Sequence, residues 1–275
     1  MKKPKNRGTA IDIKRYRTWV QEFSSYRHSV PEGRIRDWIA LFDEGDRDVA
    51  ARVLDCVDFF SHEQISAAFK TILSALDGWH KDEAKRSGKW RFIAYSASAG
   101  ESGDTMLAKF RHANNLAGQQ HNELFIHRSD ILREGLGFDD VVVLVDDFIG
   151  TGDQACSSWN EIYGELLAEV GRVYLVVVAA RDKAIEVVGE ETSLEVVPHF
   201  PLRDSDNVFD SSCKFFNSEE KARILKYCEK VDRKEPKGRG DCGLLVVFSH
   251  TIPNNSIPIL SKRSKHWEPL FSRYD

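Results

Sequence analysis

Short runs of consecutive apolar residues, separated by amphipathic stretches, restrict the fold of this chain more than any other feature. The runs "VVVLV" at 141–145 and "YLVVV" at 174–178 contain no polar residue that could face water. Strands of this kind are typical of a parallel sheet whose two faces are both covered by helices. From Trp90 onward such runs alternate with helical patterns. The sequence therefore predicts an α/β fold, a parallel sheet of five or six strands flanked by helices.

The expected strands begin near Trp90, and helices are expected between most of them, at 104–115, up to 170, at 182–190 and at 218–229. The strand candidates are "WRFIAYS", "ELFIHR", "VVVLVDD", "RVYLVVVAA", "SLEVVPHF" and "GLLVVFS".

The segment before Trp90 has a different pattern. Apolar residues recur at helical spacing between 35 and 76, which predicts three packed helices. The basic start "MKKPKNRGTAIDIKRYRTWV" is interpreted as a solvated tail. We therefore expect an N-terminal tail and helical region over residues 1–85, and an α/β domain with a C-terminal extension over residues 86–275.

The composition of the chain limits which binding partners and which cellular location are expected. The chain has 39 basic and 43 acidic residues, a net charge of −4, so its charge offers no broad reason to bind nucleic acid or a membrane surface. Its five cysteines are spread out and form no C-x-x-C pair, which argues against a disulfide framework or a structural zinc site and favours a cytoplasmic location. No apolar run approaches membrane-spanning length.

An acidic pair follows the third expected strand. Asp146 and Asp147 would lie at the carboxyl end of this strand, where open α/β sheets bind ligands. The next residues, "GTGDQA", lead through a glycine turn into a helix, whose free amides favour a phosphate. Carboxylates accept hydrogen bonds from ribose hydroxyls or hold Mg²⁺ through water, so the pair and the turn together suit a phosphorylated sugar.

The same segment is compatible with two other kinds of structure. In the first, Asp147 caps the turn, Asp146 is merely exposed, and the glycines only permit tight backbone geometry. In the second, the strand is the metal-binding strand of a nucleoside triphosphatase. That function needs a phosphate-binding loop of the form G-x-x-x-x-G-K-[ST], which the sequence lacks, so the second interpretation is set aside.

The stretch "VVVLVDDFIGTG" resembles the phosphoribosyl pyrophosphate motif of type I phosphoribosyltransferases. The resemblance implies the phosphoribosyltransferase fold and, as ligand, a Mg²⁺ complex of phosphoribosyl pyrophosphate. It also implies that Asp146 and Asp147 address the ribose hydroxyls and the metal as catalytic residues, and that the turn wraps the 5′-phosphate. The binding residues implied in the turn are Gly150, Thr151, Gly152, Asp153 and Gln154.

The family places its pyrophosphate-binding loop after the first strand, where this chain has "SASAGESG" at residues 96–103. Small residues let backbone amides approach an anion closely, and serine hydroxyls add donors. A flexible strand-to-helix turn explains the same residues equally well. The candidates of this loop are Ser96, Ser98, Gly100, Ser102 and Gly103.

Three positions depart from the family pattern. Gln154 replaces a second Ser or Thr that holds the phosphate in many members, and Asp153 brings a negative charge to the phosphate loop. Gly150 stands where purine-using members often carry an acid that helps to handle the base. These departures resemble a divergent branch of phosphoribosyltransferase-like proteins from bacterial conflict and antiviral systems, some of them linked to retrons. The C-terminal "TIPNNSIPIL" and "HWEPLFSR" segments fit that branch, and the resemblance spans most of residues 35–273.

The resemblance implies an enzyme that binds phosphoribosyl pyrophosphate or a related nucleotide with Mg²⁺ and reacts at ribose C1′, as an effector in antiphage defence. The alternative is an inactive ribose-phosphate sensor or partner-regulated module, favoured by Gly150 and Gln154. The N-terminal helices would then dock a protein or ribonucleoprotein defence partner, although homodimer contacts explain them equally well. No membrane contact is expected.

Other residues were considered and given less weight. His112, His121 and His127 show no spacing with acids that defines a metal site and are interpreted as surface or core residues. Cys156 follows the turn, but no base partner is identifiable, so buried packing is expected. The stretch at 198–216 either forms part of a hood over the site, or recognises a base, or is an ordinary surface crossover. The basic "SKRSKHW" would suit nucleic acid or the acidic face of a partner, but it is interpreted as a solvated tail.

Overall fold

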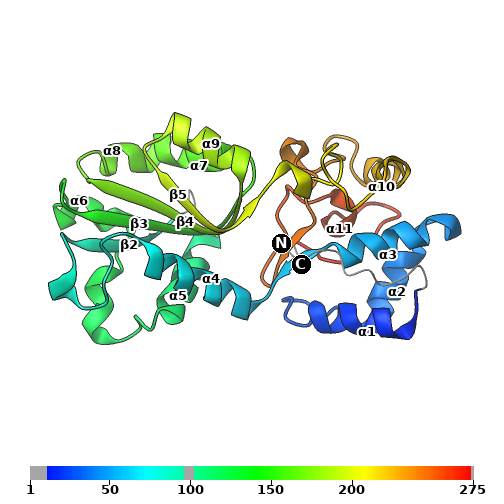
Figure 1. The fold of residues 1–275 in the computed structure, drawn as a ribbon, viewed down its shortest axis with the longest axis horizontal. Coiled ribbons are helices and arrows are strands. Elements are labelled where there is room, and N and C mark those ends of the chain that lie inside the picture. The colour runs from blue at the N-terminus through cyan, green and yellow to red at the C-terminus, as the bar shows by residue number, and fades with distance from the viewer. Residues whose placement is uncertain (1–10, 96–101, 274–275) are drawn as a thin grey trace. The chain divides into compact units, whose positions relative to one another are not determined.

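The computed structural model describes residues 11–95 and 102–273 and divides the chain into two compact units (Figure 1). The first, called here the terminal unit, takes in Met1–His62 and Arg203–Asp275. The second, called the sheet unit, is Glu63–Leu202 and interrupts the terminal unit in the sequence. The expected division near residue 85 falls inside the sheet unit.

The sheet unit is built on four parallel strands in the order β2–β3–β4–β5. Their bounds are Trp90–Ala94 for β2, Val141–Ile149 for β3, Arg172–Arg181 for β4 and Glu195–Leu202 for β5. The predicted parallel α/β sheet is thus confirmed, but among the described residues it has four strands where five or six were expected. The expected "ELFIHR" strand contributes one parallel bridge, from Phe125 to Phe92 of β2. It lies on the side of β2 away from β3, because β2 pairs with β3 through its other edge.

This order contains a reversal. From β2 the chain first visits the edge position at Phe125 and then returns to the other side of β2 to form β3, after which β4 and β5 follow in sequence. In open α/β sheets such a reversal opens a crevice outside the carboxyl ends of the two strands at the switch, and ligands bind there. In this chain the switch lies between β2 and β3.

Helices cover both faces of this sheet (Figure 1). On one face lie α4 (His62–Ala75) and α5 (Ser102–Ala113). The ring centroid of Phe110 in α5 lies 5.6 Å from that of Phe69 in α4 and 5.1 Å from that of Phe92 in β2. On the other lie α7 (Asp153–Ser158), the π-helix η5 (Trp159–Tyr163), α8 (Gly164–Leu166) and α9 (Asp182–Glu191). Burial on both faces explains why residues 141–145 are all apolar, since all five are buried. The remaining elements of the unit are η2 (Glu83–Lys85), η3 (Gln119–Leu124), η4 (Arg128–Asp130) and α6 (Ile131–Glu134).

The terminal unit is mainly helical. Its elements are α1 (Ile13–Glu22), α2 (Glu32–Ala40), η1 (Glu44–Asp46), α3 (Arg47–Asp55), β1 (Asp58–Phe60), η6 (Asp204–Asp206), α10 (Ser218–Val231), η7 (Arg239–Asp241), β6 (Val246–Phe248) and α11 (Pro258–Ser261). The three helices predicted between residues 35 and 76 are confirmed as α2, α3 and α4, although α4 belongs to the sheet unit from Glu63 onward.

Two expectations about the ends of the chain are wrong. The "GLLVVFS" segment does not continue the main sheet, because β6 pairs in parallel with the three-residue β1, with Phe60 beside Phe248. Nor is the start a solvated tail as far as it is described: α1 buries Tyr16 and Trp19. Its basic residues obscure an apolar stripe at helical spacing, which the rest of the terminal unit covers.

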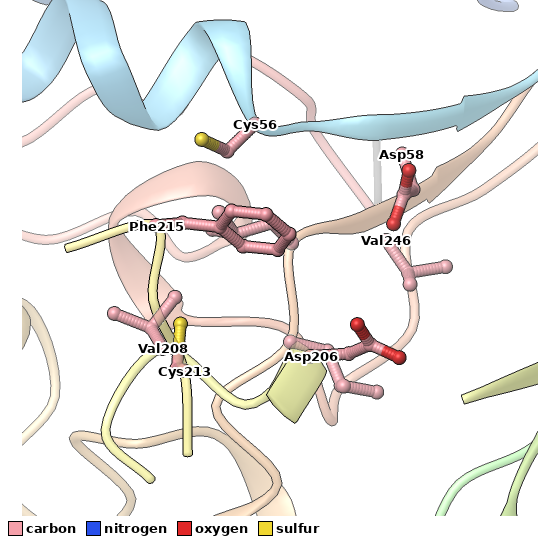
Figure 2. A pocket seen from close by; sticks show the side chains of 9 residues that line it. Cys56, Asp58, Asp206, Val208, Cys213, Phe215 and Val246 are labelled. Carbon is pink, nitrogen blue, oxygen red and sulfur yellow. The ribbon is translucent and has the colours of Figure 1, made fainter. Parts of the chain in front are cut away.

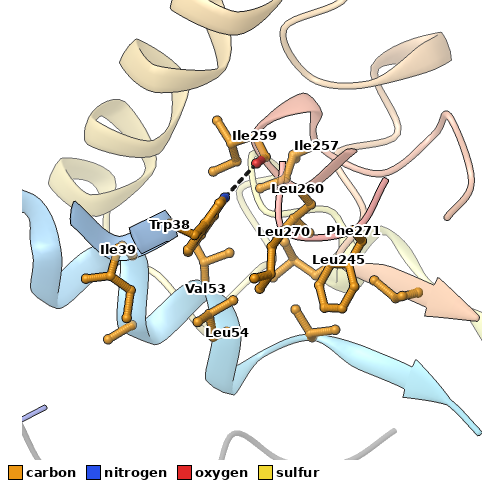
Figure 3. Packing of buried hydrophobic residues seen from close by; sticks show 14 of the residues in the cluster. Trp38, Ile39, Val53, Leu54, Leu245, Ile257, Ile259, Leu260, Leu270 and Phe271 are labelled. Carbon is orange, nitrogen blue, oxygen red and sulfur yellow. Dashed lines mark hydrogen bonds between the residues drawn. The ribbon is translucent and has the colours of Figure 1, made fainter. Parts of the chain in front are cut away.

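The C-terminal segment is part of the same core (Figure 3). Trp267, expected in a solvated tail, is 6% exposed, and its ring centroid lies 5.1 Å from that of Phe42. Its indole and that of Trp38 both donate to the carbonyl oxygen of Ile259, at 2.9 and 3.0 Å. The satisfied indole N–H groups let two large rings be buried without an unpaired donor. The segment 250–271 therefore anchors the N-terminal helices.

A buried ion pair joins α1 to the last residue of α3. Arg15 Nη2 lies 2.6 Å from Asp55 Oδ2, and the two side chains are only 3% and 6% exposed. The Trp19 indole also donates to Asp55 Oδ1, at 2.9 Å. A buried charge needs this kind of partner, because water no longer solvates it.

None of the helices in the described part of the chain has the length and apolar character that crossing a membrane requires.

Candidate functional site

The two acids of the motif face opposite sides of the sheet. β3 extends through both, and successive side chains of a strand point to alternate faces. Phe92 lies beside Val143 in register, and its ring packs on Phe110 of α5. Val143 therefore faces α5, and so does Asp147, four residues further along the strand. Asp147 is 7% exposed, and Asp146 is half-buried on the opposite face.

Asp146 lies on the side of α7 with Tyr95, the residue after β2. The Tyr95 hydroxyl donates to the carbonyl oxygen of Ala155 at 2.6 Å, and its ring centroid lies 5.0 Å from that of Tyr163. Burial raises the pKa of Tyr95 strongly, and Tyr163 and the negative charge of Asp146 raise it further. Asp146 Oδ1 accepts the backbone N–H of Asp147 at 2.8 Å. The acidic pair thus presents one carboxylate on each side of the strand end.

The turn after β3 has the predicted tight geometry. Gly152 has φ of +93°, and a Cβ atom there would lie 3.3 Å from both the carbonyl oxygen of Ala184 and Val187 Cγ1 of α9. The positive φ favours glycine, and a Cβ atom at this distance would force α9 to shift by a few tenths of an ångström. The side chain of Thr151 accepts the N–H of Asp153 at 3.4 Å, and the carboxylate of Asp153 is exposed. Gly150 is buried and Gln154 is exposed. The turn leads directly into the N-terminus of α7, and a glycine turn before a helix is the arrangement that suits an anion.

The predicted pyrophosphate loop is only partly described. Ser96, Ser98 and Gly100 lie outside the described residues. Ser102 begins α5, and Gly103 is buried in its first turn. The strand before the loop is placed clearly, since Ala94 pairs with Val145 and the N–H of Tyr95 donates to the Val145 carbonyl oxygen at 2.9 Å. Tyr95, the last described residue before this loop, therefore lies next to the residue that precedes the acidic pair, at the switch between β2 and β3.

Two residues near the acids were missed from the sequence. Lys109 of α5 interacts electrostatically with Asp147, and Tyr95 with Asp146. Burial lowers the pKa of the Lys109 ammonium, while the attraction of Asp147 opposes that change. A signal was available for Lys109: it lies seven residues after Ser102, so both share one face of the helix that follows the predicted loop.

The described residues hold no group of three or more His, Cys, Asp or Glu side chains arranged to bind a metal. The acidic pair offers only two carboxylates. They lie on opposite faces of the strand, so each face offers a single carboxylate. That is compatible with Mg²⁺, which usually keeps several waters and is held by one or two carboxylates together with substrate phosphates.

A small cavity lies in the terminal unit (Figure 2). It is lined by Cys56, Asp58, Asp206, Val208, Cys213, Phe215, Leu244, Leu245 and Val246. Burial raises the pKa of Cys56 to about 12, and Asp55 adds to the rise. In the sheet unit, burial and a hydrogen bond with Glu191 raise the pKa of Cys156 to about 11. Both thiols are protonated at neutral pH, so neither is an activated nucleophile.

This protonation predicts slow alkylation. At about pH 8 a thiol with a pKa of about 12 has roughly a thousandfold less thiolate than an unperturbed cysteine. We expect iodoacetamide to modify Cys56 in the folded chain at least roughly a hundredfold more slowly than in the urea-unfolded chain. Peptide mass spectrometry after timed quenching measures both rates. Comparable rates in the two states would show that Cys56 is an accessible, reactive thiol.

The comparisons with known proteins agree with this geometry. The chain matches the family model PRTase-CE over residues 35–273. No curated protein matches it. The matched segment covers most of both units, and the parallel sheet flanked by helices is the fold expected from the motif. The chain belongs to the PRTase-CE family, a phosphoribosyltransferase-like family.

Proposed function

We propose that this protein binds phosphoribosyl pyrophosphate, or a nucleotide with the same ribose phosphate, together with Mg²⁺, and reacts at ribose C1′. One observation carries the proposal: the acidic pair and the glycine turn lie at the switch between β2 and β3. This is the position where open α/β sheets bind ligands.

Different residues would bind different parts of the ligand. Asp146 and Asp147 would accept hydrogen bonds from the ribose hydroxyls and hold Mg²⁺ directly or through water. The turn at 150–153 would hold the 5′-phosphate through its amides and through the Thr151 hydroxyl, and the Asp153 N–H would turn from Thr151 Oγ1 to the phosphate. Mg²⁺ would neutralise charge on the departing diphosphate. As that group leaves, C1′ becomes electron-poor, so the remaining task of the chain is to hold the ribose in place and exclude water.

The exposed position of Asp153 affects how strongly its carboxylate would repel a phosphate bound in the turn. A carboxylate within a few ångströms of a phosphate would cost on the order of 1 kcal/mol or more. The Asp153 side chain is exposed while its N–H is directed to Thr151, so its charge is solvated rather than enclosed in the turn. This arrangement supports phosphate binding despite the unusual sequence.

A second candidate function is a sensor that binds the same ligand without turnover. Gly150 provides no acid to handle a base, and Gln154 is exposed at the position of the usual second hydroxyl. Under this hypothesis ligand binding would regulate a protein or ribonucleoprotein partner.

We also propose a biological role and a cellular location for the protein. Membership of PRTase-CE and the resemblance to retron-linked conflict proteins support an effector role in bacterial antiphage defence, in the cytoplasm. The helical terminal unit would contact the partner or a second copy of the chain.

The test uses the full chain with Mg²⁺ and labelled phosphoribosyl pyrophosphate or nucleotides. We expect saturable binding and release of diphosphate or free base, both lost in the double variant Asp146→Asn/Asp147→Asn. Saturable binding without turnover, with and without cell extract, would favour the sensor. If the wild-type chain binds none of these ligands, the ribose-phosphate hypothesis is wrong.

A further inference from the structure

The guanidinium of Arg86 is buried without acceptors. Its side chain is only 7% exposed, and within the described part of the chain nothing accepts a hydrogen bond from its enclosed Nε and Nη1 atoms. Its Nη2 atom lies 4.0 Å from Glu83 Oε2, too far for a hydrogen bond, and the Glu83 side chain is 85% exposed. A buried charge is strongly destabilising unless polar partners replace the water that it loses. Arg86 therefore imposes a cost on the free protein that its long contact with Glu83 offsets only in part.

Aromatic rings cover one side of this guanidinium. Arg86 Cζ lies 5.3 Å from the ring centroid of Trp79, and that centroid lies 5.2 Å from each of those of Trp90 and Phe92. The indole N–H of the buried Trp90 also donates to none of the residues that the structure describes. A ring attracts a cation over its face but does not replace the acceptors of a hydrogen bond. The two side chains with unsatisfied donors therefore flank the same ring, that of Trp79, at the amino end of β2.

The segment around Arg86 carries an excess of positive charge. Residues 79–91, "WHKDEAKRSGKWR", contain five basic residues and two acidic ones, in a chain whose net charge is −4. The side chains of both acids, Asp82 and Glu83, are exposed, so water screens them. Burial lowers the pKa of the Arg86 guanidinium, and Glu83 opposes only part of that change. The buried cation is thus not neutralised by its own segment.

A buried histidine lies near the same cations. His121 belongs to η3, which packs against β2. Burial lowers its pKa, and the positive charges of Lys81, Arg86 and Arg111 lower it further. A neutral imidazole can donate or accept one hydrogen bond, whereas the three cations only donate. This region of the sheet unit therefore offers donors and positive charge in excess.

A phosphate group has the properties that would satisfy this region. It brings several acceptor oxygens and, as a monoester, close to two negative charges at neutral pH. Arginine is especially suited to bind it, because the planar guanidinium presents five N–H donors. A single carboxylate from a protein partner would offset less of the positive charge of the segment. Phosphate is therefore the ligand chemistry that the observations favour.

We propose that Arg86 and the indole N–H of Trp90 form a second anion-binding site, which takes the phosphate group of a ligand at the amino end of β2. The acidic pair follows the opposite, carboxyl end of the strands, so this inference does not depend on the proposed function. The phosphate would approach from the side of Glu83, where the guanidinium lies nearest to solvent. Residues 80–85 are all exposed, and a shift of this segment would open the enclosed donors to the ligand.

Arg86→Met separates a binding role from a structural one. If the guanidinium serves a ligand, an apolar side chain of similar length should pack on Trp79 equally well. The melting temperature of the free chain should then stay the same or rise. A melting temperature several degrees below that of the wild type would show that Arg86 holds the loop in place, and it would overturn the inference.

The binding test uses the full wild-type chain and the double variant Asp146→Asn/Asp147→Asn, because a binding event common to both belongs to the second site. Isothermal titration without Mg²⁺ near neutral pH measures Kd for inorganic diphosphate and for a short single-stranded oligonucleotide. In both backgrounds Arg86→Met should weaken binding about tenfold to a hundredfold, the usual cost of losing one hydrogen bond to a charged group. The control Lys85→Met removes the same charge from a neighbouring side chain that is 63% exposed, and it should weaken binding by less than about threefold.

The two probes identify the source of the phosphate. Binding of diphosphate that depends on Arg86 indicates a free phosphate ligand, and binding of the oligonucleotide alone indicates a nucleic-acid backbone. If neither probe binds the two backgrounds in common, the inference is wrong, whatever happens at the acidic pair. Equal losses in Arg86→Met and Lys85→Met would show that only the overall charge of the loop matters, which also overturns it. Loss of turnover at the acidic pair with the shared binding retained would sink the proposed function alone.

Discussion

Asp147→Asn is expected to lower kcat/KM for phosphoribosyl pyrophosphate by about a hundredfold, the largest effect of any single substitution at the site. The carboxylate is buried at the end of β3 and would accept a ribose hydroxyl or hold the metal, and each such charged contact contributes roughly 1.5–3 kcal/mol. The amide keeps the shape of the side chain and removes its charge. Steady-state release of diphosphate measures the effect, and Asp146→Asn should show a loss of the same order.

Asp153→Asn is the matched control. It also removes one carboxylate from the motif, but this one is exposed and lies beside the phosphate turn. Removing a like charge from near the 5′-phosphate should leave affinity unchanged or tighten it severalfold, by on the order of 1 kcal/mol at most. A loss in Asp153→Asn as large as that in Asp147→Asn would contradict the assignment of the acidic pair.

The Asp147→Asn substitution also has an expected effect that can be measured without a ligand. Since Asp147 raises the pKa of Lys109 and burial lowers it, Asp147→Asn should lower that pKa further. Titration of the lysine followed by NMR measures the change. An unchanged pKa would show that the two groups are not close in solution.

Asp55→Ala is expected to reduce the free energy of unfolding by about 3–5 kcal/mol, the largest effect on stability. Asp55 accepts bonds from the Arg15 guanidinium and the Trp19 indole, and its removal leaves a buried positive charge without its acceptor. Urea denaturation followed by tryptophan fluorescence measures the change. The expected loss is a large share of the total free energy of unfolding, which is typically about 5–15 kcal/mol for folded proteins.

Asp48→Ala on the same helix separates the effect of burial from that of pairing. Asp48 forms an ion pair with Arg223, at 2.6 Å, but its side chain is 54% exposed. Exposed pairs typically contribute no more than about 1 kcal/mol, so this variant should unfold close to the wild-type midpoint. If the two variants lost equal stability, the buried network would have no special role in attaching α1.

The main sheet and the core of the site were predictable because their signals are local. A run such as 141–145 has no polar face, and the acids and glycines that follow specify a strand end and a tight turn through their own backbone preferences. The opposed directions of Asp146 and Asp147 were less apparent, because they depend on the strand continuing through both residues.

Long-range pairing was not predictable in the same way. "GLLVVFS" has the pattern of another strand of the main sheet, but the pattern does not identify its partner, and β6 pairs with three residues near Phe60 instead. The same applies to Trp267, whose basic neighbours suggest a solvated tail although its ring packs against Phe42. Partners far apart in sequence are chosen by the packing of the whole unit.

The sequence by itself determined the α/β class, the family motif and the positions of the acidic pair and the glycine turn, because each depends on residues within a few positions of one another. Only the tertiary structure decided that residues 11–62 fold with residues 203–273, and that Asp147 shares its face of the sheet with α5. These contacts depend on which apolar faces cover one another, and that is settled only when distant segments pack together.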